Sequence, residues 1–170
     1  DGLISFCQSL QSAGASLITI HGRTYCQAFK GEADWEPIYE LKKHLQIPLL
    51  GNGDVLDRQD GLKRMQNLDG FMIGRQAIGN PWCFRDSKKF PSPVLGERIQ
   101  VALDHYGLLC KLRPERVAVR EFRKYLGHYV KGFLNAKAWR NRMMECESSS
   151  EFVICMNRLQ HEEGFLKLAG

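Results

Sequence analysis

The chain has 170 residues, of which 44% are hydrophobic and 25% are charged, so it can fold into one ordinary domain or two small ones. No apolar run approaches the roughly 18 residues of a membrane span, and the first residues lack the basic segment of a signal peptide. We therefore expect no membrane span in these 170 residues and no clear signal peptide at their start. The net charge of +5 is uneven, because residues 1–93 hold 11 Lys or Arg against 10 Asp or Glu.

The first part of the chain alternates between helical and strand patterns. Short apolar strands are predicted over 17–20, 48–50 and 71–73, and helices over 3–13, 35–45 and 57–67, with a polar loop over 22–34. Asp57 is the expected N-cap of the third helix, with Asp60 three residues later. Strands separated by single helices are typical of consecutive βα units in a parallel barrel.

Polar residues follow each of the three strands: His21-Gly-Arg23, Asn52-Gly53-Asp54 and Gly74-Arg75. In a (β/α)₈ barrel the active site lies at these carboxyl ends of the strands. Three strands cannot close a barrel, which needs eight. We therefore expect the chain to be a fragment that holds the distal βα units of a TIM barrel and lacks its N-terminal half.

A Pro-containing stretch over 88–93 marks the expected domain boundary, because the pattern beyond it is helical throughout. Helices are predicted over 95–112, 114–131, 135–147 and 148–162. The predicted fold class is therefore α/β followed by all-α. Residues 1–93 would form the C-terminal part of the barrel, and residues 94–170 would form a helical bundle.

The segment from Lys111 to Arg142 holds ten basic residues and only two acidic ones, which is typical of a nucleic-acid-binding surface. Arg120, Arg123 and Lys124 share one helix face by their spacing, and Lys131 continues near it. Tyr125 and Tyr129 border this face, either as stacking platforms or, more simply, as core residues. The alternative for the basic residues is a solvated helix face, although such faces usually alternate in sign.

Cysteines occur at positions 7, 26, 83, 110, 146 and 155, without a CxxC pair or a Cys/His cluster of zinc spacing. This scatter favours free thiols in a reducing cytoplasm and predicts no metal site.

An ordered set of motifs points to one family: His21-Gly-Arg-Thr24 with Gln27 and Gly31, Ala33-Asp-Trp35, Ile47-Pro48 with Gly51-Asn-Gly-Asp54, Gly70-Phe-Met-Ile-Gly-Arg75, Gly79-Asn-Pro-Trp82, and Val119-Arg-Glu-Phe-Arg-Lys-Tyr-Leu126 with Tyr129 and Lys131-Gly132. Together they resemble the C-terminal half of a bacterial-type tRNA-dihydrouridine synthase. The resemblance implies an FMN-containing barrel followed by a helical tRNA-binding domain. It also implies reduction of a uridine C5=C6 bond in tRNA by a flavin that NADPH has reduced.

The resemblance further implies a proton-donating cysteine on an earlier loop and a flavin-contacting lysine on an earlier strand. Both positions fall before residue 1, and Cys26 does not occupy the place where the family has its acid. We therefore expect the 170-residue chain alone to be inactive.

With the family resemblance, cofactor binding is expected of His21, Arg23, Asn52, Gly53, Asp54, Gly74 and Arg75. On their clustered charge and helical spacing, tRNA binding is expected of Arg120, Arg123, Lys124 and Lys131. For His21 the alternative is a core histidine, and for Asn52-Gly53-Asp54 it is an ordinary βα turn. Arg23 can equally pair with a carboxylate inside the barrel. Two other functions remain open, namely another phosphate-clamping flavin barrel acting on a small molecule, and a non-catalytic RNA-binding paralogue.

Overall fold

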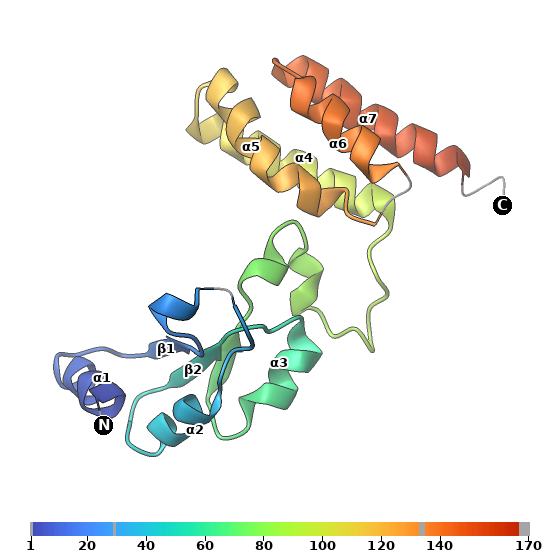
Figure 1. Cartoon of the computed structure of the whole chain (residues 1–170). Coiled ribbons are helices and arrows are strands. Elements are labelled where there is room, and N and C mark those ends of the chain that lie inside the picture. The colour runs from blue at the N-terminus through green and yellow to red at the C-terminus, as the bar shows by residue number, and fades with distance from the viewer. Residues whose placement is uncertain (1, 29, 133–134, 167–170) are drawn as a thin grey trace. The chain divides into compact units, whose positions relative to one another are not determined.

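The computed structural model describes residues 2–28, 30–132 and 135–166 and divides into two compact units (Figure 1). The first unit comprises Asp1–Ala77 and Pro81–Pro91, and the second comprises Ile78–Asn80 and Ser92–Gly170. Their boundary near Pro91 lies within the Pro-containing stretch. Among the described helices, none is long and apolar enough to cross a membrane.

The first unit is a three-stranded parallel sheet in the order β1-β2-β3, with one helix before each strand. Its elements are α1 (Gly2–Ser12), β1 (Ile18–His21), η1 (Tyr25–Gln27), α2 (Glu36–Lys42), β2 (Leu49–Asn52), α3 (Arg58–Met65), β3 (Gly70–Met72), η2 (Arg75–Ala77) and η3 (Pro81–Phe84). The three predicted strands and three predicted helices are confirmed within a few residues at each end. Residue 29 of the predicted loop lies outside the described residues.

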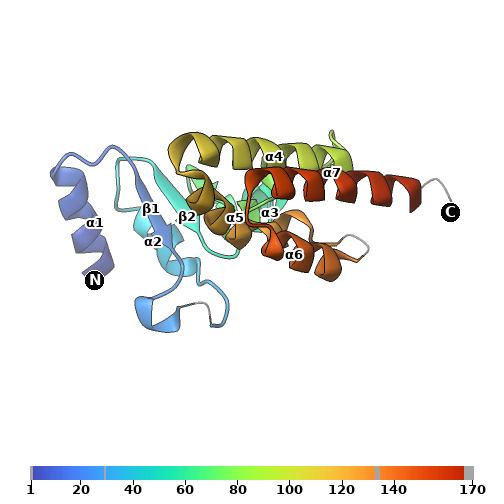
Figure 2. The same ribbon diagram turned by 90° about the horizontal axis from the view of Figure 1, so that it is seen from above.

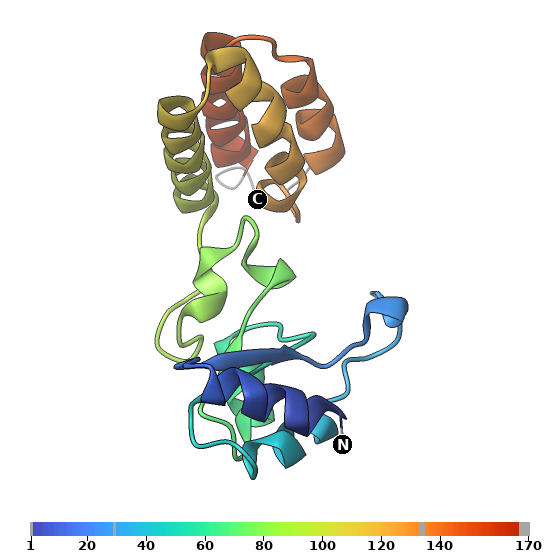
Figure 3. The same ribbon diagram turned by 90° about the vertical axis from the view of Figure 1, so that its left-hand side faces the viewer.

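One face of this sheet packs against the helices, which lie on the same side of the strands in Figure 3. Ile18 and Leu49 are paired in register and buried on this face together with Ile38 and Leu41 of α2. Gly61 of α3 lies directly against the Phe71 ring, so the helix approaches β3 closely. The core of this unit therefore lies between the sheet and its helices, and the opposite face carries the remaining side chains.

Local signals account for the start of α3. The Asp57 carboxylate accepts a hydrogen bond of 2.8 Å from the Asp60 N–H, as expected for an N-cap. The Asp60 side chain in turn accepts from the Leu56 N–H and pairs with Arg64 one turn later. This cap fixes where the chain leaves the loop that follows β2.

The described residues of the second unit form four helices: α4 (Leu95–Leu112), α5 (Glu115–Tyr129), α6 (Ala136–Glu145) and α7 (Ser149–Leu166) (Figure 2). These are the four helices predicted from the sequence. The core is centred on aromatic rings, since Phe122 of α5 contacts Tyr106 of α4 and Phe152 of α7. Each of these rings is at least 97% buried.

The segment Ile78–Asn80 belongs to the second unit, although the sequence assigns it to the first domain. Gly79 has φ +66°, and a Cβ placed there would lie 2.7 Å from the Cβ of His128 at the end of α5. The absence of a side chain at residue 79 lets this segment pack directly on α5. Sequence spacing alone does not reveal such an approach.

Candidate functional site

The ends of the three strands bring polar residues together on the sheet face opposite the helices. His21 is in register with Asn52, and Asn52 with Met72, so all three lie in one row across the sheet. The Asn52 amide donates a hydrogen bond of 3.2 Å to the Met72 sulfur, and a Cβ on Gly74 would lie 4.0 Å from the Asn52 side-chain oxygen. The sequence-predicted residues of all three strand ends are therefore neighbours.

Asn52 is followed by two residues with positive φ, Gly53 at +132° and Asp54 at +56°. A Cβ at residue 53 would lie 2.5 Å from the Ala33 Cβ and 3.7 Å from His21 Cε1, so only glycine fits there. The Gly53 carbonyl accepts a hydrogen bond of 3.1 Å from the buried Trp35 indole. The buried Trp35 side chain thus supports this turn.

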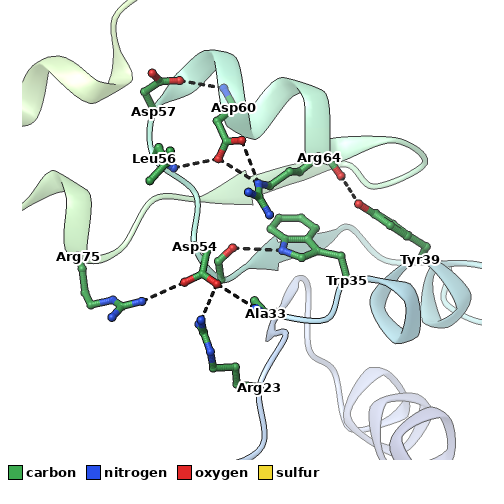
Figure 4. Close-up of polar contacts among 11 residues, drawn as sticks. Arg23, Ala33, Trp35, Tyr39, Asp54, Leu56, Asp57, Asp60, Arg64 and Arg75 are labelled. Atoms are coloured by element: carbon green, nitrogen blue, oxygen red, sulfur yellow. Dashed lines mark hydrogen bonds and ion pairs between the residues drawn. The ribbon is translucent and has the colours of Figure 1, made fainter. Parts of the chain in front are cut away.

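Asp54 is the centre of the polar contacts at this edge (Figure 4). Its Oδ2 accepts hydrogen bonds from the Arg23 guanidinium and from the Ala33 N–H, the latter at 2.9 Å. Its Oδ1 pairs with the Arg75 guanidinium at 3.1 Å. One carboxylate therefore joins the ends of all three strands: Arg23 follows β1, Asp54 follows β2 and Arg75 follows β3.

The two arginines differ sharply in exposure. The Arg23 side chain is 3% exposed, whereas the Arg75 side chain is 54% exposed. Arg23 also donates to the Gly31 carbonyl at 2.7 Å, while its Nε and Nη1 have no hydrogen-bond partner among the described residues. The sequence leaves two roles open for Arg23, namely contact with a ligand and pairing with a carboxylate. The structure shows the second, with Asp54 as the partner.

Hydrogen bonding and charge shift the Asp54 ionisation. The Arg23 hydrogen bond holds the pKa of the Asp54 carboxyl below its usual range, with further contributions from the Ala33 N–H and from Arg75. Asp54 is therefore ionised at neutral pH, and the cluster of Arg23, Asp54 and Arg75 carries two positive charges and one negative charge. This arrangement can bind an anion at its exposed arginine.

The predicted RNA-binding residues do not share one environment. Arg120, Lys124 and Lys131 are exposed on α5 and the turn after it. Arg123 is partly buried and donates a hydrogen bond of 2.8 Å to the Cys146 carbonyl at the end of α6. Tyr129 is buried, with its hydroxyl 3.1 Å from His105 Nδ1, so it belongs to the core as the simpler alternative predicts.

Sequence reasoning missed Arg98, which donates hydrogen bonds to the carbonyls of His128 (3.2 Å) and Lys131 (3.1 Å). These bonds hold the turn that carries Lys131. No local sequence pattern predicts these hydrogen bonds, because the partners lie at least 30 residues apart in the chain.

All six cysteines are free thiols, and burial raises the pKa of the Cys155 thiol to about 11. Cys26 is exposed on η1. Within the part of the chain that the structure describes, no group of three or more His, Cys, Asp or Glu residues is placed to hold a metal ion.

Comparison with known proteins assigns the family. The family model described as dihydrouridine synthase (Dus) matches residues 1–167. The chain belongs to the dihydrouridine synthase family. A probable tRNA-dihydrouridine synthase of Mycobacterium tuberculosis (strain CDC 1551 / Oshkosh) is 35% identical over 159 residues, covering 88% of this chain and 41% of that protein.

Two other relatives give the same result. A probable tRNA-dihydrouridine synthase of Aquifex aeolicus (strain VF5) is 34% identical over 151 residues, covering 86% of this chain and 48% of that protein. A probable tRNA-dihydrouridine synthase 1 of Synechocystis sp. (strain ATCC 27184 / PCC 6803 / Kazusa) is 31% identical over 158 residues, covering 88% and 44%. The chain thus spans less than half the length of these dihydrouridine synthases.

Proposed function

We propose that this chain forms the distal βα units of an FMN-binding TIM barrel and the helical tRNA-binding unit of a cytoplasmic tRNA-dihydrouridine synthase. The whole enzyme reduces specific uridines in tRNA to 5,6-dihydrouridine with NADPH. The observation that carries this proposal is the meeting of three strand ends, with His21, Asn52-Gly53-Asp54 and Gly74-Arg75, at one edge of a parallel sheet.

The residues at this edge fit FMN by their chemistry. The phosphate is an anion, and Arg75 presents a guanidinium with more than half of its side-chain surface exposed. Gly74 has no side chain to prevent an approach to its main chain. Asn52 and His21 offer polar groups on the same sheet face for a polyol and a ring oxygen. When bound, FMN supplies the hydride chemistry at the uridine double bond.

The residues of this chain would then bind and orient FMN and the tRNA. Arg75 and the Gly74 main chain would hold the phosphate. Asn52 and Gly53 would bind the ribityl chain, and His21 would contact the ring system. The proton donor is assigned to a cysteine in the segment before residue 1 and not to Cys26. Arg120, Lys124 and Lys131 bind the tRNA backbone, because exposed basic side chains displace condensed counterions from phosphates.

The whole protein, purified and loaded with FMN, tests the proposal directly. NADPH oxidation should depend on added unmodified tRNA, and dihydrouridine should accumulate in that tRNA. The 170-residue chain alone should give no turnover. NADPH oxidation that proceeds without tRNA would favour a flavin barrel acting on a small molecule. Binding of tRNA without any binding of FMN would favour a non-catalytic RNA-binding paralogue, and either result would overturn the proposal.

A further inference from the structure

Arg23 and Arg75 contact opposite oxygens of the same carboxylate but occupy opposite environments. Asp54 Oδ2 receives Arg23 and the Ala33 N–H, while Oδ1 pairs with Arg75 (Figure 4). Arg23 is almost fully buried and Arg75 is more than half exposed. A ligand at the strand ends can therefore reach Arg75 and cannot reach Arg23.

An arginine whose charge is offset by a neighbouring carboxylate is a poor phosphate ligand. The pair is electrically neutral, and the carboxylate repels an arriving phosphate. In this cluster a second guanidinium lies on the other oxygen of Asp54. Two positive charges and one negative charge leave one positive charge beside the exposed side chain.

We propose that Arg23 is a buried counter-ion for Asp54, and that it thereby preserves the positive charge of Arg75 for the phosphate of FMN. Arg23 acts through Asp54 and is a positioning residue without contact to the ligand. The inference rests on the proposed function, since it concerns the phosphate that Arg75 would bind. Of the two roles that the sequence leaves open for Arg23, it assigns the carboxylate pairing and gives that pairing a purpose in phosphate binding.

Asp54 has a structural reason to be present in spite of its charge. Its Oδ2 accepts the Ala33 N–H, and this bond ties the segment after β1 to the turn after β2. Arg23 reinforces the same connection by donating to the Gly31 carbonyl. A substitution at Arg23 therefore has a structural effect as well, and the test must separate this effect from the electrostatic one.

The ratio of FMN affinity to riboflavin affinity provides that separation. Riboflavin lacks the phosphate, so the ratio reports the contribution of the phosphate to binding. A general distortion of the site would instead lower the affinities for both flavins equally. Both affinities are measured by calorimetric titration of the whole flavin-free protein. Arg23→Gln should lower the ratio about tenfold or more, the scale of one charge-assisted hydrogen bond. Arg75→Ala should lower it at least as far.

The decisive variant is the double substitution Arg23→Gln with Asp54→Asn. It replaces both partners of the ion pair between the buried Arg23 and the partly buried Asp54. Neutral replacement of a whole ion pair is better tolerated than removal of one partner. Asp54 then no longer offsets the charge of Arg75, so the ratio should return most of the way to the wild-type value. This rescue also keeps the test informative if Arg23→Gln alone does not fold.

Gln27→Ala is the matched control. Gln27 caps η1 by accepting a hydrogen bond of 2.7 Å from the Thr24 N–H, and its side-chain hydrogen bonds among the described residues are with Thr24 and not with the charge cluster. The ratio should therefore not change. The inference is overturned if folded Arg23→Gln keeps the wild-type ratio, if Arg23→Gln lowers the ratio further in an Arg75→Ala background, or if Asp54→Asn gives no rescue. A wild-type protein that binds neither flavin would instead refute the proposed function.

Discussion

Arg123 of α5 donates a hydrogen bond of 2.8 Å to the main-chain carbonyl of Cys146, the residue that ends α6. A guanidinium at a helix C-terminus satisfies an otherwise unpaired carbonyl and interacts favourably with the helix dipole. Arg123→Ala should therefore lower the unfolding free energy of the helical unit by about 1.5–3 kcal/mol. Urea denaturation followed by circular dichroism measures this change.

The comparison variant is Arg120→Ala, one turn earlier on the same helix. Arg120 is exposed, and removal of an exposed side chain usually changes stability by less than about 0.5 kcal/mol. Equal midpoints for the two variants would show that the Arg123 hydrogen bond does not stabilise the bundle.

Salt dependence distinguishes a tRNA-binding surface from a solvated one. Each phosphate contact releases condensed counterions, so Arg120→Ala with Lys124→Ala should lower the slope of log K against log salt by about 2 for tRNA. Filter binding or anisotropy at several salt concentrations gives the slope. Lys63→Ala on α3 removes an exposed charge from the other unit and should leave the slope unchanged. Equal slopes for all three proteins would leave the basic residues of α5 without a role in RNA binding.

Removal of Arg75 should weaken retention of FMN by the whole protein. Arg75→Ala loses the exposed guanidinium beside Asp54, and a charge-assisted hydrogen bond to phosphate is worth about 1.5–3 kcal/mol. Flavin absorbance after gel filtration should therefore fall. Arg85→Ala, which removes another exposed arginine of the same unit, is the control. Full flavin content in Arg75→Ala would contradict the phosphate assignment.

The stability of the helical unit should depend on the pH through His105. This side chain packs against the rings of Phe122, Tyr125 and Tyr129, and burial lowers the pKa of His105 below its ordinary value. The unfolded chain then binds the proton more tightly than the folded chain does. The contribution of neutral His105 to the unfolding free energy should be fully present above the unfolded pKa of about 6.5, and it should decrease as the pH drops below that value.

Thermal unfolding at a series of pH values between 5 and 8 tests this dependence. His105→Gln removes the titrating ring, so its stability should vary less over this range than that of the wild type. Identical pH profiles would assign the dependence to another group.

Gly79→Ala should destabilise the second unit. Its φ of +66° is unfavourable for alanine by about 1–2 kcal/mol, and the new Cβ would collide with the His128 Cβ at 2.7 Å. Gly107→Ala on α4 is the matched substitution, because no described atom outside its own helix backbone and chain neighbours lies within 4 Å of its Cβ position. That change should raise stability by up to about 1 kcal/mol through helix propensity. Differential scanning calorimetry of both variants should show opposite shifts.

The sequence predicts the secondary structure well because local signals are strong. Examples are the Asp57 cap of α3 and the apolar spacing that buries Phe122 and Leu126 on one side of α5. It also places His21, Asn52 and Arg75 at strand ends, and parallel pairing then brings the strand ends together.

Side-chain partners that are distant in the chain are not predictable from these patterns. Arg23 and Arg123 stand among other polar residues at spacings that suit a ligand or RNA, yet each is engaged within its own unit. The deciding factor is burial, which depends on how neighbouring elements pack. The approach of Gly79 to His128 escapes prediction for the same reason.

The two groups of buried side chains described above have no member in common among the described residues. One is built around Ile38, Leu41 and Leu49, and the other around Phe122, Phe152 and Met156. Residues that share one contiguous core tend to unfold together as one cooperative unit. Heating should therefore produce two separate heat-absorption peaks in place of one. A single melting temperature would then not describe this chain. A flavin that binds at Arg75 should raise the peak of the sheet-containing unit, and tRNA should raise the peak of the helical one.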